Sequence, residues 1–137
     1  MINALNSSVS GMIAQSTKIA ASASNIANAD VIGSLDANAA RTPYQALDVN
    51  ITSTSERGNI GGVRPEIYVR EPATTIAYDP TSQYADKNGF VGAPNVNLTE
   101  EVTSNIVATQ AYKANAQMIS VIDDMNDALL NAVRTDA

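Results

Sequence analysis

The stretch that decides the fold runs from Leu5 to Ile26 and reads LNSSVSGMIAQSTKIAASASNI. A strict 3.5-residue repeat of apolar or small residues predicts a helix that keeps one stripe against a partner helix in a left-handed supercoil. The residues around the stripe are polar but barely charged, which favours packing on several sides. A single amphipathic helix of an ordinary bundle is the alternative. The stripe consists of Leu5, Val9, Met12, Ser16, Ile19, Ala23 and Ile26.

A second long helix is predicted near the C-terminus, where NVNLTEEV begins at Asn95. Asn97 is placed as an N-cap with Glu100 three residues later, the spacing of a capping box, and Glu100 and Glu101 lie at the positive end of the helix dipole. At about 1.5 Å per residue the helix is roughly 50 Å long, so it projects or packs on a partner. Its seam consists of Leu98, Val102, Asn105, Thr109, Tyr112, Ala116, Ile119, Ile122, Met125, Leu129 and Val133.

Short β-strands are predicted between the two helices. YQALDVNIT alternates, with Leu47, Val49 and Ile51 on one face, and EIYVRE and TTIAYDP are β-branched or aromatic runs. Asn88-Gly89 is a strong signal for a two-residue hairpin turn. Because five of the six aromatic residues lie between positions 44 and 90, this region reads as a separate module.

These patterns together predict an α+β fold. Long N- and C-terminal helices form a coiled-coil domain, and a small β-rich module is inserted between them. The expected boundaries are residues 1–30 for the N-terminal helix, 31–43 for a linker loop, 44–92 for the β-rich module and 93–137 for the C-terminal helix. A module of this size folds only marginally by itself.

Charge and composition exclude several function classes. The formal net charge is −6, and the chain has no basic patch, so nucleic-acid binding lacks the lysine and arginine contacts that drive it. No window reaches the roughly 18 consecutive apolar residues of a membrane span. The first basic residue is Lys18, so we expect no cleaved signal peptide at the N-terminus.

The sequence offers little catalytic chemistry. With no histidine and no cysteine, the chain lacks the commonest general base, thiol nucleophiles and the usual zinc ligands. Asp123, Asp124 and Asp127 form a tight acidic cluster, which on an exposed helix indicates a solvated face. We therefore expect no enzyme, no cofactor, no metal site and no small-molecule substrate.

Two long signatures lie at the ends of the chain. Met12 to Ala29 reads MIAQSTKIAASASNIANA, an apolar heptad ending in Ser-Asn-Ile-Ala-Asn, and DKNGFVGAPNVNLTEEV is followed by IVATQAYKANAQMI. Both resemble the flagellar rod, hook and hook-associated protein family. The short length, and the Asn-Gly turn leading into PNVN, are most similar to a proximal rod member. One departure is DPTSQYADKNG, where this member commonly has a His-Pro pair near Gln83 and Tyr84.

The resemblance implies a structural subunit of the bacterial flagellar basal-body rod. It implies export in an unfolded state through the flagellar type III apparatus and assembly in the periplasm. The terminal segments would pair as coiled coils in the wall of an inner tube, with the middle module outside. The implied partners are copies of the same chain, other proximal and distal rod proteins, the junction with the MS ring, and the export apparatus.

The helical seams supply the residues that we expect to carry assembly. Asn25 and Asn28 fall on the Ser-Asn-Ile-Ala-Asn signature at the end of the first helix, where asparagine tolerates the left-handed conformation that stops a helix and can bond neighbouring backbone. The hypothesis is that they fix how the chain leaves the tube wall, and an ordinary C-cap is the alternative. The expected interface consists of Leu5, Val9, Met12, Ile19, Ala23, Ile26, Val102, Tyr112, Ala116, Ile119, Ile122, Met125 and Leu129.

Two other functions stay open at the level of the sequence. A soluble helical adaptor or secretion chaperone would keep its helices in a compact bundle. A small cell-wall-binding module would use Tyr68, Tyr78 and Tyr84, although tyrosines of this kind are also typical of a core.

Overall fold

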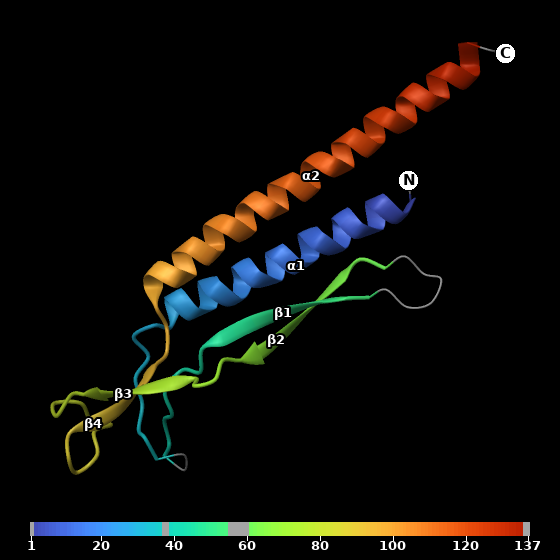
Figure 1. Cartoon of the computed structure of the whole chain (residues 1–137). Coiled ribbons are helices and arrows are strands. Elements are labelled where there is room, and N and C mark those ends of the chain that lie inside the picture. The colour runs from blue at the N-terminus through green and yellow to red at the C-terminus, as the bar shows by residue number, and fades with distance from the viewer. Residues whose placement is uncertain (1, 37–38, 55–60, 136–137) are drawn as a thin grey trace.

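The computed structural model describes residues 2–36, 39–54 and 61–135. Parts of the expected linker, of the β-rich module and of both chain ends therefore lie outside the described residues. The element order is α1 (Ile2–Ala27), β1 (Leu47–Ser53), β2 (Val63–Val69), β3 (Thr74–Tyr78), β4 (Phe90–Pro94) and α2 (Leu98–Thr135). Two long terminal helices with a β-rich segment between them confirm the coarse α+β prediction (Figure 1).

The two helices run antiparallel and side by side. They approach closely because α1 turns small side chains toward α2: a Cβ built on Gly11 would lie 2.9 Å from Asn115 Nδ2. Nearer the other end, Ser22 Oγ donates to the Glu101 carbonyl at 3.0 Å. The helices have 26 and 38 residues, so the C-terminal part of α2 projects beyond the N-terminus of α1 (Figure 1).

The start of α2 is capped as the sequence predicts. The Asn97 side-chain oxygen accepts the Thr99 N–H at 3.0 Å and the Glu100 N–H at 3.4 Å. These bonds satisfy two backbone donors that a helix leaves open in its first turn.

The β1–β2 hairpin packs on the other side of α1 from α2 (Figure 1). Its antiparallel register places Val49 opposite Ile67. The Val63 N–H donates to Ser10 Oγ at 3.1 Å, and a Cβ on Gly62 would collide with the same hydroxyl. The hairpin therefore lies directly on the small side chains of α1.

β3 and β4 form a second two-stranded antiparallel sheet rather than extending the first one. The expected two-residue hairpin at Asn88-Gly89 is not what joins them. Residues 79–89 form the connection, and its last four residues form a turn directly before β4. In this turn the Gly89 N–H donates to the Asp86 carbonyl and the Asp86 N–H donates to the Phe90 carbonyl. Gly89 has φ of +85°, which glycine adopts without strain. The Asp86 carboxylate accepts a hydrogen bond from the Phe90 N–H, and this bond holds the pKa of Asp86 below its usual value.

Few side chains are buried. The buried apolar residues of the described chain are Ala14, Ala21, Ala46, Val91, Ala108 and Ile122. A core role for the middle tyrosines is wrong for Tyr68 and Tyr78, which are exposed. Within the described ranges no helix is both long and apolar enough to cross a membrane.

Asn97→Ala should lower the free energy of unfolding of the α2 start by about 1 kcal/mol, since the cap bonds are lost. The measurement is helical circular dichroism during denaturant titration. Asn97→Asp keeps an acceptor at the cap and serves as the matched control. Equal behaviour of the two variants would contradict the capping role.

Candidate functional site

Asn25 lies at the centre of the most connected polar site in the structure. It is 1% exposed and belongs to the last turns of α1. Its Nδ2 donates to the Leu47 carbonyl at 2.8 Å, while its Oδ1 accepts the Leu47 N–H at 2.8 Å. The side-chain amide thus takes the place of a neighbouring strand at the first residue of β1. The Tyr44 hydroxyl also donates to Oδ1 at 3.1 Å.

Glu101 brings the start of α2 into the same site. The residue is 3% exposed, and its Oε1 accepts from Asn25 Nδ2 at 3.0 Å and from Arg70 Nη2 at 2.8 Å. Arg70 follows β2 and also donates to the Asn95 carbonyl at 3.2 Å. A buried carboxylate is tolerated here because it is both paired and hydrogen-bonded.

We call Asn25, Tyr44, Leu47, Arg70 and Glu101 the polar junction. It ties α1, α2, β1 and the end of β2 together, and the Asn25 amide uses both of its hydrogens and both lone pairs of its oxygen there. Removing one member leaves buried partners unsatisfied, which costs more than the lost bond itself. The junction is therefore a fixed joint between the helices and the β-rich segment.

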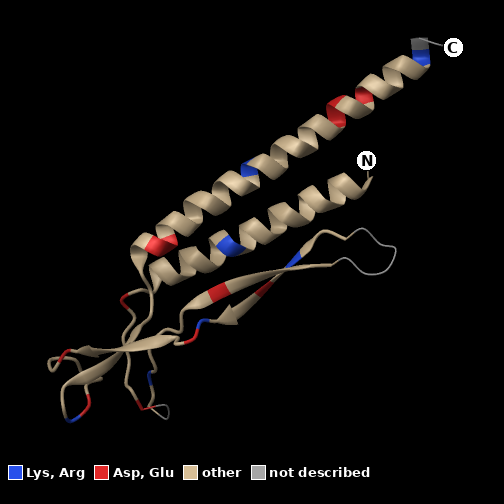
Figure 2. Cartoon of the chain, in the orientation of Figure 1, with Lys and Arg blue, Asp and Glu red and all other residues tan. Residues whose placement is uncertain are grey.

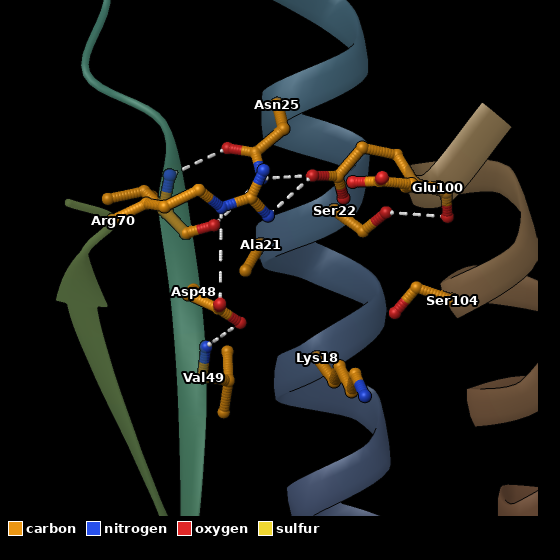
Figure 3. Close-up of a pocket in the computed structure, with 11 residues that line it drawn as sticks. Lys18, Ala21, Ser22, Asn25, Asp48, Val49, Arg70, Glu100 and Ser104 are labelled. Atoms are coloured by element: carbon orange, nitrogen blue, oxygen red, sulfur yellow. Dashed lines mark hydrogen bonds and ion pairs between the residues drawn. The ribbon is translucent and has the colours of Figure 1, made fainter. Parts of the chain in front are cut away.

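An open hollow of about 210 Å³ lies beside the polar junction (Figure 3). Lys18, Asp48, Glu100 and Ser104 are among the side chains that line it. Among the described residues, no group of three or more acidic side chains lies close enough together to hold a metal ion. The side chains that line the hollow carry charges of both signs.

Asn28 acts at the end of α1 in a simpler way. Its Nδ2 donates to the Ser24 carbonyl at 2.8 Å, which satisfies a carbonyl of the last helical turn. The expected left-handed conformation is wrong for both asparagines, because no described residue other than glycine has positive φ. The prediction that their amides bond neighbouring backbone is confirmed, since Asn25 reaches Leu47 and Asn28 reaches Ser24.

Most of the expected assembly residues are exposed or half-buried on α1 and α2. Three hollows between α1 and α2 contain many of them: Leu5 with Ile122, then Val9 and Met12 with Tyr112 and Ile119, then Ile19 with Val102. Ile122 is buried, whereas Val9, Ala23, Val102, Tyr112, Met125 and Leu129 are exposed, and Leu5, Met12, Ile19, Ile26, Ala116 and Ile119 are half-buried.

The sequence did not reveal Arg70 or Glu101 as site residues. Glu101 reads as one of two acids in the first turn of a helix, where an interaction with the helix dipole is the default expectation. Its burial follows from an arginine 31 positions earlier in the chain. No local pattern encodes that pairing.

Two family models match the chain. One, described as "Flagella basal body rod protein", matches residues 5–33, and the other, "Flagellar basal body rod FlgEFG protein C-terminal", matches residues 87–132. The first range contains most of α1, and the second contains β4 and most of α2.

Curated relatives extend the similarity over nearly the whole chain. The flagellar basal-body rod protein FlgC of Buchnera aphidicola subsp. Acyrthosiphon pisum is 34% identical over 127 residues, which are 91% of this chain and 92% of the relative. This chain belongs to the FlgC family of flagellar basal-body rod proteins. FlgC of Yersinia enterocolitica is 33% identical over 88% of each chain, and FlgC of Salmonella typhimurium is 30% identical over 91% of this chain and 92% of the relative.

Asn25→Ala should lower the free energy of unfolding by about 1–3 kcal/mol, because Leu47 and Glu101 lose a buried partner. Denaturant titration of the purified chain measures the loss. Asn28→Ala removes only the bond to Ser24 and is the control, with an expected loss below that of Asn25→Ala. If both variants lose the same free energy of unfolding, the polar junction does not contribute more to stability than an ordinary helix-end hydrogen bond.

Proposed function

We propose that this FlgC-family chain is a structural subunit of the flagellar basal-body rod that assembles helically through α1 and α2. In this proposal it takes a place in the proximal rod, next to other rod proteins and the MS-ring junction. It reaches the periplasm through the flagellar type III export apparatus. The observation that supports helical assembly is the apolar surface left exposed on both helices.

The amount of exposed surface supports an assembling subunit. The chain exposes 9235 Å². A compact monomer of 14.3 kDa exposes roughly 6,800 Å² by the usual scaling with mass. The excess of about 2,400 Å² is as large as the surface buried in a substantial protein interface.

The apolar character of the exposed helix surface also supports an assembling subunit. Exposed large apolar residues line α2 from Leu98 to Val133, and α1 adds Val9 and Ile13. Lys18 is the only charged residue of α1, and the middle of α2, from Val102 to Ile122, carries no charged residue other than Lys113 (Figure 2). Exposed apolar surface of this extent is typical of an interaction site.

Association would order the helices as it buries them. Fully burying a Leu, Ile or Met side chain contributes roughly 2 kcal/mol before the entropy of ordering is subtracted. A rod requires a heterologous contact, in which two different surfaces of the chain meet and the assembly keeps growing. The polar junction would hold the β-rich segment at a fixed angle outside the helical wall.

One observation favours a second candidate. Ile76, Tyr78 and Phe90 are exposed together on the β3–β4 sheet, and the rings of Tyr78 and Phe90 pack edge to face with centroids 5.5 Å apart. An exposed aromatic patch suits a cell-wall glycan surface. Binding of the purified chain to isolated cell wall, lost in Tyr78→Ser, would support this candidate, and unchanged sedimentation with and without cell wall would remove it.

Ile19→Asp should abolish assembly, because a carboxylate would stand in the apolar hollow that Ile19 shares with Val102 and Ile106. Sedimentation of concentrated chain measures assembly, and recovery of the variant in rods of a deletion strain measures incorporation. Ser120→Asp, at an exposed position of α2, is the matched control and should assemble. Normal incorporation of Ile19→Asp would contradict the role of the helices.

A further inference from the structure

Each helix also carries a heptad stripe of largely exposed residues at the margin of the contact between the two helices. On α1, three residues of this stripe border the open hollow that also contains Tyr112 and Ile119 of α2, namely Val9, Ile13 and Ser16. On α1 the steps of three and four select Asn6, Val9, Ile13, Ser16, Ala20, Ala23 and Ala27, all of which are exposed. On α2 they select Val107, Ala111, Ala114, Met118, Val121, Met125 and Ala128, of which Ala111 is half-buried and the others are exposed. We call these the outer seams of α1 and α2.

The two outer seams match one another. Each spans 22 residues, contains no charged side chain, and follows the same alternation of steps when one of them is read backwards. An antiparallel pairing therefore brings every position of one seam opposite a position of the other, with Val9 opposite Met125 and Ile13 opposite Val121. In the same pairing Ser16 lies opposite Met118 and Ala27 lies opposite Val107, and these small residues of α1 allow close approach there.

We propose that the outer seam of α2 in one copy packs, antiparallel, against the outer seam of α1 in the next copy. This inference rests on the proposed function and specifies its subunit contact. The alternative pairing of α2 with α2 would join identical surfaces and close a dimer, leaving the α1 seam exposed. Pairing α2 with α1 joins two different surfaces and satisfies both seams, so each added copy leaves one seam free for the next copy.

The pairing fixes the axial offset between neighbouring copies. Within one chain Gly11 lies beside Asn115 and Asn25 bonds to Glu101, so Ile13 is level with Lys113. Between copies Ile13 would be level with Val121, eight residues farther along α2. At 1.5 Å per residue, each copy would be displaced by about 12 Å relative to its neighbour.

This offset accounts for the projecting end of α2. Leu129 and Leu130 lie beyond the part of α2 that α1 covers within the chain, and they are 53% and 62% exposed. The shift would carry the N-terminal turns of the neighbouring α1 alongside this segment. The extra length of α2 thereby becomes part of the contact between copies.

Disulfide trapping tests the pairing, because the chain has no cysteine of its own. Ile13→Cys and Val121→Cys, one of them carrying a size tag, are mixed at a concentration at which the wild-type chain sediments, and then oxidised. The expected main product is the mixed dimer. A mixture of Ile13→Cys with Asp123→Cys is the control and should yield at least tenfold less, because Asp123 lies roughly 200° around α2 from Val121.

Three results would overturn the pairing. A predominance of Val121→Cys homodimers would show that α2 packs on α2. Sedimenting assemblies without the mixed dimer would refute this contact while leaving helical assembly intact. Failure of the wild-type chain to sediment at any concentration would refute the proposed function and the pairing together.

Discussion

The close approach of α1 to α2 is the constraint on which the rest of the structure depends. Ser22 and Gly11 allow the helix backbones to come near one another, and the larger side chains of the predicted seams are displaced to the edges of the contact. The helix pair therefore has a thin, partly polar interior. Because apolar burial is the dominant favourable term in folding, a pair of this kind gains much of its stability from neighbours.

The polar junction converts this weakly buried pair into a joint of defined geometry. Asn25 pairs with the backbone of Leu47 as a strand would, and Glu101 holds Arg70 at the point where the chain returns from the hairpin. A satisfied buried network selects one arrangement, since shifted arrangements leave polar groups unpaired. In the proposed rod subunit, the helices gain stability from neighbouring copies, whereas the polar junction is held together within one chain.

Local sequence signals predicted much of this architecture. The cap at Asn97, the two long helices and the positions of β1, β2 and β3 follow from residue pattern and turn chemistry. The sequence could not show which stripe of α1 faces α2, because small residues such as Gly11 and Ser22 mark close approach without adding hydrophobicity. It also could not show that Glu101 is buried, since its partner Arg70 is distant in the chain.

Hydrogen exchange at the amides of α2, followed from dilute chain to sedimenting assemblies, tests the central claim most directly. The account predicts fast exchange in the dilute chain, particularly beyond Met125, and strong protection once copies associate. Equally strong protection of α1 and α2 in the dilute, solitary chain would contradict the account, because the helices would then be stable without neighbours.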